Sequence, residues 1–506
     1  MFVCSVDPIA RVQIMSQESG RERIRAVPEN EGRLRANAIG LKDAIVIGLA
    51  SSGPTASIAL TLAAIVAASS YAAPVAVLVC FVPMLGIALA YRRLNMWHVN
   101  CGGTFVWAGR AISPWFGFVV GWIMLLGYFL GTISDVLPIG PYALQVLAPG
   151  HADSNIGAAI SASIWLVVVA VIAYVGIQAT VRLQWIFAAV EYSIILVFAV
   201  IALAAVFGGH AGSVPFDWSW FSWSTLGGTT GLVNGILIAV YMFSGWDSSV
   251  YVNEETTEAS RNPGRAAVTS VVLLGLMYSF FTFAFQGAIG EKQLQDNGDN
   301  ALSAIANSLA GSPWDKVMIV AVLLSVVGAT QTAMVSGARI AFSMGQSRVL
   351  PPVLGRTHPR HRTPAVATLL FALLCLLALW IYLLGSSSVQ SSFDRVVGSV
   401  GLCFALFYAA TGISVAVYYR ELARQSLGNL VGLLIFPAAS AVFLLWVAWK
   451  SIPGLGGWNG SIMHYLYVMM GIGIVLMFLA RFWQHAPYFA EPREAYRVEE
   501  TGRSEW

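Results

Sequence analysis

The chain has 506 residues, of which 57% are hydrophobic and only 10% are charged. With a mean hydropathy of +0.72, it carries more apolar surface than a soluble core can bury. This composition excludes an ordinary soluble domain, and a net charge of +3 does not indicate a nucleic-acid partner. We therefore predict an integral membrane protein that is surrounded by the lipid bilayer.

Apolar runs that can cross a membrane recur along the whole chain. A bilayer core about 30 Å thick takes about 20 apolar residues to cross, and by that criterion we predict about twelve transmembrane helices. Polar, charge-mixed tails, residues 1–36 and 485–506, flank them and are expected to be flexible. In chain order, the predicted spans are residues 42–68, 73–93, 114–147, 157–176, 183–208, 228–252, 266–289, 314–345, 364–384, 394–419, 428–450 and 462–483.

Arginines mark one side of the predicted membrane. No apolar segment typical of a cleavable signal precedes the first span, so the N-terminus is expected to stay in the cytoplasm. With that start, the positive-inside rule places the arginine-rich loops and both termini in the cytoplasm. Heavy use of Ala, Gly and Arg favours a bacterial inner membrane. The arginines concerned are Arg92, Arg93, Arg182, Arg261, Arg265, Arg348, Arg356, Arg360, Arg362, Arg420 and Arg424.

Two spans are interrupted near their middles. The first carries Ala50-Ser51-Ser52-Gly53-Pro54-Thr55-Ala56-Ser57, and the sixth carries Phe243-Ser244-Gly245-Trp246-Asp247. Gly and Pro disfavour a continuous helix, and irregular backbone at membrane depth persists only where it lines a cavity or lies within protein. Two broken helices in corresponding halves of a chain indicate the binding site of a transporter.

Several motifs occur in the order and spacing typical of one transporter family. They are the Ser-rich break in the first span, Gly102-Gly103-Thr104-Phe105-Val106-Trp107, Gly121-Trp122, Gly245-Trp246-Asp247, Glu254-Glu255, Arg261-Asn262-Pro263, and Gly337-Ala338-Arg339 to Leu350-Pro351. Over residues 40–360 the chain resembles amino acid permeases of the amino acid, polyamine and organocation superfamily. The resemblance implies an all-α, LeuT-like fold with two inverted five-helix repeats and discontinuous first and sixth helices.

The resemblance also divides the chain and implies its activity. A transporter domain is expected at residues 37–484, with repeats at 42–208 and 228–419 and extra helices at 428–483. The expected activity is secondary active transport of an amino acid or amine, without enzymatic chemistry, as a proton-coupled symporter. An antiporter, a polyamine carrier and a transporter-like receptor are the alternatives. A channel would need a continuous polar stripe, which the spans lack.

The break in the first span is predicted to hold a substrate carboxylate. Unwinding leaves backbone N–H groups without partners at the positive end of a half-helix, where an anion can accept from them. A kink without a ligand is the alternative. The expected donors are the amides around Ser52, Gly53, Thr55 and Ala56 and the hydroxyls of Ser51 and Ser52.

The break in the sixth span is expected to receive the amino group of the substrate. Carbonyl groups freed near Phe243, Ser244 and Gly245 can accept hydrogen bonds from it. Trp246 or Phe243 is expected to close over the site. Tyr128 in the third span is a further candidate for the pocket.

Acidic residues within apolar spans are candidates for function by default. Glu191 stands where many proton-coupled relatives carry a lysine, so the resemblance implies an ion-coupling position. We expect this carboxylate to bind and release a proton. A sodium ion held with oxygens of Ser325 or Thr330 is one alternative, and a purely structural hydrogen bond is another.

Two further acids are distinguished by their positions. Asp135 lies deep in the third span, where relatives place residues that contact the substrate, and its charge would favour an amine. Capping of the span before Pro138 explains Asp135 equally well. Asp247 follows the Gly-aromatic-acid motif of the family and is expected to orient the broken helix or to pair with a cytoplasmic base during gating. Glu255 and Arg339 are expected to be inner-gate or topology residues.

Metal and disulfide chemistry are not expected. The five cysteines form no CxxC pair and the seven histidines are scattered. No cofactor is predicted besides the coupling ion, with a proton preferred to sodium. The sequence leaves open the identity of the substrate and the oligomeric state.

Overall fold

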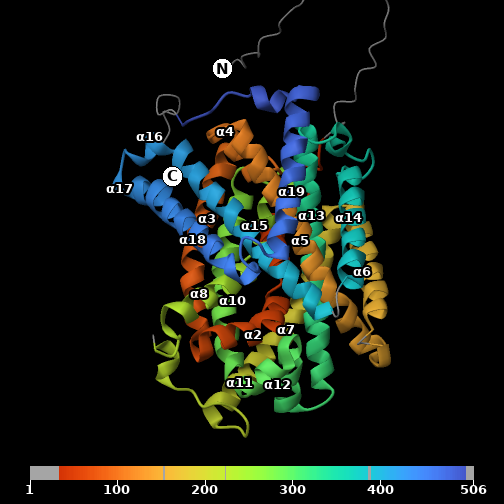
Figure 1. Ribbon diagram of the computed structural model, residues 1–506, viewed down its shortest axis with the longest axis vertical. Helices are drawn as coiled ribbons and strands as arrows, with labels where there is room; N and C mark the ends of the chain where they lie inside the picture. The colour runs from red at the N-terminus through yellow and green to blue at the C-terminus, as the bar shows by residue number, and fades with distance from the viewer. Residues whose placement is uncertain (1–32, 152–153, 223, 386–388, 497–506) are drawn as a thin grey trace, which may run out of the picture. The chain divides into compact units, whose positions relative to one another are not determined.

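Helices make up nearly all of the regular structure in the computed structural model, which describes residues 33–151, 154–222, 224–385 and 389–496 (Figure 1). Within these residues, the β pairing is limited to an isolated parallel bridge between Ile39 and Thr256. The described residues belong to a unit that spans Gly32–Trp506. Most of the predicted tails, at residues 1–32 and 497–506, lies outside them. The all-α fold class is confirmed.

The first span is broken at a single residue. Helix α1, Leu41–Ser52, ends at Gly53, whose φ of 49° is left-handed, and α2, Pro54–Ser69, begins at the next residue. Glycine adopts this conformation without steric cost. Proline suits the first position of a helix because its missing N–H would have no intrahelical partner there. The chemistry of Gly53 and Pro54 therefore accounts for the break.

The sixth span has a longer interruption. Helix α8, Gly228–Met242, is followed by five turn residues and by the short α9, Ser248–Tyr251. A 3₁₀ turn, η4 at Asn253–Glu255, continues the chain. Gly245 lies at the centre of the interruption with a φ of 98°. Both helix breaks thus occur at the residues that the sequence predicts.

The remaining spans are close to the predicted ranges. The largest difference is at the fifth, which begins six residues earlier than predicted, at Ile177, because Gly176 with a φ of 142° sets the start of the helix. These spans are α3 (Ala73–Trp97), α5 (Pro114–Leu147), α6 (Asn155–Val175), α7 (Ile177–Gly208), α10 (Asn262–Gln286), α13 (Trp314–Gln346), α14 (Ala365–Leu384), α15 (Val389–Tyr418), α17 (Leu427–Asn429) with the π-helix η7 (Leu430–Ile435) and α18 (Phe436–Ser451), and α19 (Ser461–Phe478) with the π-helix η9 (Leu479–Trp483).

The lengths and composition of these helices suit a membrane. Within the described residues, ten stretches are long and apolar enough to cross a bilayer. The first, Leu41–Trp97, contains both the broken α1–α2 pair and α3, and the short α8 belongs to a further span. The set agrees with the predicted number of crossings. Exposed apolar side chains such as Ile164, Leu373 and Val475 give the outer helices a surface suited to lipid.

Short helices in the connections were not predicted. Helix α4, Thr104–Ala111, joins α3 to α5, and α16, Arg420–Ala423, follows α15. Helices α11, Glu291–Asn297, and α12, Ala301–Ala310, precede α13. Figure 1 shows α4 and α16 at the opposite end of the bundle from α11 and α12. The α4 end carries the arginine-rich connections and is the end predicted to face the cytoplasm.

Helix α13 lies at the centre of the bundle and is more buried than any other candidate span. It packs against α5, α7 and α1, and this arrangement places it beside the first helix break. Its glycines and small residues allow such close packing. At Gly337, for example, an added Cβ would lie 2.4 Å from the ring of Phe371. The core therefore brings α5, α7 and α13 to the same region as the two breaks.

Part of the predicted C-terminal tail packs on this core. Tyr488, in the 3₁₀ turn Pro487–Ala490, is 3% exposed and donates a hydrogen bond to the carbonyl of Phe105 at 3.0 Å. A Cβ added at Gly109 or at Gly117 would lie only 2.3 Å from the Tyr488 hydroxyl, so both positions need glycine. Arg110 Nη1 pairs with Glu494 at 2.8 Å. These contacts were not anticipated from the polar composition of the segment.

Candidate functional site

The two helix breaks touch each other. The hydroxyl of Ser248, at the start of α9, donates to the hydroxyl of Ser51 in α1 at 2.7 Å. A Cβ added at Gly245 would lie 2.6 Å from the carbonyl oxygen of Ser51, so only a glycine allows this approach. The folding of the chain therefore joins the residues of both predicted breaks in one site.

Few backbone amides remain free at the first break. The amide of Ser52 lies within the last turn of α1, and that of Gly53 donates to the carbonyls of Leu49 and Ala50, at 3.1 Å each. The amide of Ala56 donates to Ser325 Oγ on α13 at 3.2 Å. Of the four predicted donors, only the Thr55 amide has no hydrogen-bond partner among the described residues. The first break therefore offers a substrate carboxylate fewer free backbone donors than the sequence predicts.

The serine hydroxyls of the first break are already engaged. Ser52 Oγ donates to the carbonyl of Gly48 at 3.4 Å, and Ser51 Oγ accepts from Ser248. The carbonyl of Ser52 accepts from Ser57 Oγ at 2.7 Å and from Tyr278 Oη on α10 at 3.0 Å. The hydrogen bonds from Ser57 and Tyr278 satisfy a carbonyl that the end of α1 would otherwise leave unpaired.

Two carbonyl groups are free at the second break. The carbonyl of Gly245 accepts from the amide of Ser248 at 2.9 Å. Those of Phe243 and Ser244 accept no hydrogen bond from any described residue. Ser244 Oγ itself donates to the carbonyl of Tyr241 at 2.6 Å. Of the groups predicted to bind the substrate, one backbone donor, at Thr55, and two backbone acceptors, at Phe243 and Ser244, therefore remain free.

The aromatic residues of the second break are fully buried. Trp246 stacks on Tyr408 of α15, with ring centroids 5.1 Å apart, and meets Tyr91 of α3 edge-on at 5.1 Å. Its indole nitrogen has no hydrogen-bond partner among the described residues. Phe243 packs edge-on against Tyr278, at 5.2 Å. Trp246 thus belongs to a tyrosine cluster rather than lying alone over the break.

That cluster surrounds Asp247. Tyr128 and Tyr408 donate to Asp247 Oδ1 at 2.9 and 2.7 Å. Tyr251 and Tyr91 donate to Oδ2, Tyr91 at 3.3 Å. The carboxylate is completely buried and has no cationic partner among the described residues. Four phenol donors from α3, α5, α9 and α15 replace the water that a buried carboxylate loses.

The Asp247 cluster extends toward the α4 end of the bundle. Thr104 of α4 donates to Tyr91 Oη at 3.2 Å and is 2.7 Å from Thr411 of α15. On the other side, Tyr128 Oη lies 3.2 Å from Ser248 Oγ. The network connects the second break to α4, at the end of the bundle that is predicted to face the cytoplasm.

Glu191 lies on the face of α7 that packs against α13, next to the first break. Its Oε2 is buried without a hydrogen-bond partner among the described residues, and the same is true of Thr55 Oγ1. Ser325 and Thr55 are its polar neighbours. Of the two predicted sodium ligands, Ser325 lies here, whereas Thr330 Oγ1 donates to its own helix at Val326, 2.9 Å away. Two unpaired oxygens in one buried place suit a proton or a small cation.

Asp135 faces the interior at the level of the breaks. It is partly exposed and makes no hydrogen bond to any described residue. Tyr241 of α8 and Tyr278 of α10 are close enough to interact electrostatically with its carboxylate. Helix α5 continues through Pro138 to Leu147, so Asp135 does not cap the end of a span. The structure therefore contradicts the capping interpretation.

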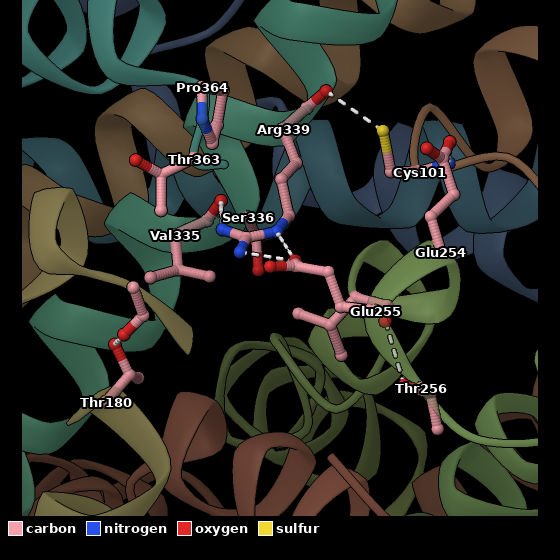
Figure 2. A network of polar contacts seen from close by, with 12 residues as sticks. Cys101, Thr180, Glu254, Glu255, Thr256, Val335, Ser336, Arg339, Thr363 and Pro364 are labelled. Atoms are coloured by element: carbon pink, nitrogen blue, oxygen red, sulfur yellow. Dashed lines mark hydrogen bonds and ion pairs between the residues drawn. The ribbon is translucent and has the colours of Figure 1, made fainter. Parts of the chain in front are cut away.

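Glu255 and Arg339 form a buried ion pair on the side of α13 that faces η4. Arg339 Nε and Nη2 lie 2.6 and 2.5 Å from Glu255 Oε2, and the side chains are 2% and 1% exposed. Figure 2 shows the two side chains facing each other between α13 and the segment after α9. Cys101 donates its amide to Glu254 at 2.9 Å. The pair links the second break to the central helix.

Sequence reasoning did not single out Tyr91, Tyr251 and Tyr408. Each lies in an apolar span, where a tyrosine is compatible with simple packing. The available signal was weak: a phenol deep within a span needs a hydrogen-bond partner, and Asp247 was already a candidate. Among the described residues, no group of three or more His, Cys, Asp and Glu side chains is placed to hold a metal ion.

A family model described as amino acid permease matches residues 39–475. The low-affinity putrescine importer PlaP of Escherichia coli K12 is 24% identical over 392 residues, which cover 74% of this chain and 80% of that protein. The human large neutral amino acids transporter small subunit 2 is 24% identical over 415 residues, 80% of this chain and 73% of the relative. The human Asc-type amino acid transporter 1 is 23% identical, covering 79% and 73%.

A solved structure shares the fold. It is a crystal structure of a mutant manganese transporter from Eremococcus coleocola, with a TM-score of 0.60. The likeness covers 87% of this chain and 94% of that one, at 14% sequence identity. This similarity supports the transporter fold and says nothing about the substrate.

Proposed function

The chain belongs to the amino acid permease family and is a membrane transporter, and from its site we propose that it carries amino acids or related amines by alternating access. The proposal rests on the direct contact between the two helix breaks. Free backbone donors and acceptors lie within the two breaks. Irregular backbone at membrane depth is typical of transporter binding sites.

The free groups suggest an orientation for the substrate. A carboxylate would accept from the amide of Thr55, at the positive end of α2. An amino group would donate to the carbonyls of Phe243 and Ser244. Tyr278 and Phe243 pack beside these groups and would cover the aliphatic part of the ligand. This arrangement suits a zwitterion, or an amine that uses the carbonyl half alone.

Asp135 favours a substrate with a positive charge. Its carboxylate has no hydrogen-bond partner among the described residues and lies near Tyr241 and Tyr278 at the level of the breaks. A carboxylate within a membrane span that lacks a partner is costly and is stabilised by a cation. A polyamine carrier is therefore the second candidate function, and PlaP, one of the relatives, is named as a putrescine importer.

Glu191 is the proposed coupling residue, with a proton as the preferred ion. The unpaired Oε2 of Glu191 and Oγ1 of Thr55 lie where α2, α7 and α13 meet, directly beside the substrate junction. Protonation would give Glu191 a donor for Thr55 or Ser325 and remove its charge. Sodium, with Ser325 Oγ as an additional ligand, is the alternative.

The Asp247 cluster and the Glu255–Arg339 pair are proposed as inner gates. The phenol donors tie α9 to helices α3, α5 and α15, and Arg339 ties η4 to α13. Release of the substrate toward the predicted cytoplasmic side would require these bonds to break. We propose the bacterial inner membrane as location, with both termini inside, and two inverted repeats at 42–208 and 228–419 that pair the two breaks.

A ligand screen tests this proposal. Purified protein is heated with amino acids, their decarboxylated amines and diamines, because a ligand that binds the folded state raises the unfolding temperature by mass action. A specific rise with one of these classes supports the proposal. If a decarboxylated amine raises the unfolding temperature as much as its parent amino acid, the result favours the polyamine carrier. If no compound of these classes raises the unfolding temperature, the proposed substrate class is wrong.

A further inference from the structure

A cavity of about 280 Å³ with several charged side chains in its lining lies at the arginine-rich end of the molecule, apart from the helix breaks. It shares Glu255 with the proposed inner gate but shares no residue with the proposed substrate junction. Its walls come from three places in the chain: the segment before α1, the start of α7 and the connection between α13 and α14. The lining side chains that matter here are Arg35, Gln178, Arg182, Glu255 and His361.

Arg35 is placed by the segment that leads to α1. The amide of Ala38 donates to the carbonyl of Glu255 at 2.7 Å, and the amide of Thr257 donates to that of Ile39 at 2.9 Å. Gln178 binds the same segment twice, since its Nε2 donates to the carbonyl of Ala38 at 3.2 Å and its Oε1 accepts from Arg35 Nη1 at 3.1 Å. These bonds hold the guanidinium of Arg35 at the cavity.

The start of α7 contributes positive charge of two kinds. The amides of Ile177, Gln178 and Ala179 have no hydrogen-bond partners among the described residues, as expected for the first turn of a helix. They lie at the positive end of a helix of 32 residues. Arg182 lines the same cavity and forms no ion pair with any described residue.

His361 approaches from the connection between α13 and α14. Its amide donates to His358 Nδ1 at 3.2 Å, and its ring lies 5.8 Å from that of Tyr174 at the end of α6. Thr363 fixes the same connection, because its hydroxyl donates to the carbonyl of Tyr174 at 2.9 Å. The imidazole is therefore held at the cavity as a further donor.

Glu255 is the one carboxylate in the described lining, and Arg339 offsets its charge. The Arg339 guanidinium lies 2.5 and 2.6 Å from Glu255 Oε2 from the opposite side, as Figure 2 shows. With that pair neutral, the cavity keeps two guanidinium groups, an imidazole and three free amides. Such a set of donors is selective for an oxyanion.

We propose that this cavity binds a phosphoryl group, a ligand distinct from the transported substrate. Guanidinium groups match phosphate oxygens in pairs, and helix N-termini bind phosphate through their free amides. A ligand bound there would bridge Arg35 to Arg182 and His361. It would therefore fasten the segment before α1 to α7 and to the α13–α14 connection, and would hold this end of the molecule closed.

The phosphoryl group can belong to a soluble phosphate ester or to a phospholipid headgroup. The first arm of the test measures thermal unfolding of the purified full chain in detergent with glycerol 3-phosphate, against sodium chloride at matched ionic strength. The second arm uses nanodiscs that contain phosphatidic acid, against phosphatidylcholine alone. Saturable stabilisation in the first arm assigns a soluble ligand, and stabilisation confined to the second assigns a lipid.

Variants separate this site from surface charge. Arg182→Gln should weaken the apparent affinity for the active probe at least tenfold, and Arg35→Gln should weaken it as well. Arg424→Gln is the matched control, because it removes an exposed arginine from the same end outside the cavity. Arg182 and Arg35 are both exposed, so neither substitution removes buried packing, and the two variants test the cavity independently.

Two results would overturn the proposal. One is the absence of stabilisation beyond the salt control in both arms. The other is a ligand-induced stabilisation that is as large in Arg182→Gln and Arg35→Gln as it is in the control variant Arg424→Gln. Neither result bears on transport, since the screen for amino acids and amines addresses the helix breaks.

Discussion

Asp135 and Asp247 are carboxylates within apolar helices, yet their surroundings differ. Four phenol groups donate to Asp247, whereas Asp135 has no hydrogen-bond partner among the described residues. A carboxylate whose hydrogen bonds are satisfied inside the protein is consistent with the gating role proposed for Asp247. One that remains unpaired is available to a ligand, and this difference separates two acids that the sequence presents alike.

Removal of the charge at Asp135 should therefore discriminate between substrates. Asp135→Asn keeps the size of the side chain but loses its charge. We expect cationic ligands to bind about 1 to 3 kcal/mol more weakly, the range for a lost hydrogen bond to a charged group, and neutral amino acids to bind unchanged. Ligand-dependent thermal shifts measure both, with Asp296→Asn on the exposed face of α11 as control. Equal losses for the two classes would remove Asp135 from substrate recognition.

Glu191 allows a different test, because a glutamine mimics its protonated form. In proteoliposomes, Glu191→Gln should still exchange substrate between the two sides but should lose accumulation driven by a pH gradient. Glu421→Gln, on the exposed surface of α16, should retain both activities. Accumulation that needs sodium in the native protein, or that survives in Glu191→Gln, would rule out Glu191 as the proton site.

The residues of this site show where sequence reasoning ends. Glu191, Asp135 and Asp247 could be found because an acid in an apolar run is conspicuous by itself. Tyr91 and Tyr408 could not, because their role depends on a partner more than 150 positions away in the chain for each. The Ala56 amide is unavailable to a substrate for the same reason, because it donates to Ser325 on a distant helix. Hydrogen bonds between elements follow from packing, which local sequence does not encode.

Among the elements, the breaks were the most predictable because their cause is local. Gly53 and Pro54 interrupt the first span by their own backbone preferences, and Gly245 does so in the sixth. Helix α4 and helices α11 and α12 lie in connections that lack the length of a span. Their positions depend on what they pack against, and they were missed.

Gly245 should be intolerant of any side chain. A Cβ would lie 2.6 Å from the carbonyl of Ser51, and the φ of 98° is unfavourable for other residues. Gly245→Ala should destabilise the folded protein by about 1 to 3 kcal/mol, the usual cost of such backbone strain, and lower its unfolding temperature. Gly471→Ala on α19, where a Cβ meets open space, is the matched control. Equal unfolding temperatures for the two variants would contradict the contact between the breaks.

The tyrosine cluster predicts how the gate proposed around Asp247 responds to the loss of one donor. Tyr408→Phe removes one donor from Asp247 Oδ1, which should destabilise the closed arrangement by about 1 to 3 kcal/mol. Amide hydrogen exchange in residues 248–255 should then become faster, because local opening becomes easier. Tyr467→Phe, whose hydroxyl bonds to Trp458 at the exposed surface, should leave this exchange unchanged. Unchanged exchange in Tyr408→Phe would mean that the cluster does not hold the gate.

At the scale of the whole molecule, the bundle places the free backbone groups of two distant segments in one buried junction. Helix α13 supports this junction through Ser325 and binds the segment after α9 through Arg339. The composition and span pattern predicted this class of fold, and the family match and the solved relative agree with it. The docking of residues 487–496 on α4 was not predictable, because it rests on the pocket that Gly109 and Gly117 leave for Tyr488.

The central claim is that substrate crosses the membrane at the junction of the two breaks by alternating access. Counterflow tests it most directly: proteoliposomes loaded with an unlabelled ligand from the screen are diluted into a trace of the labelled compound. We predict a transient accumulation of label with the native protein and with Gly471→Ala, and its loss with Gly245→Ala. Equilibration without any overshoot in the native protein, or an undiminished overshoot in Gly245→Ala, would contradict the account.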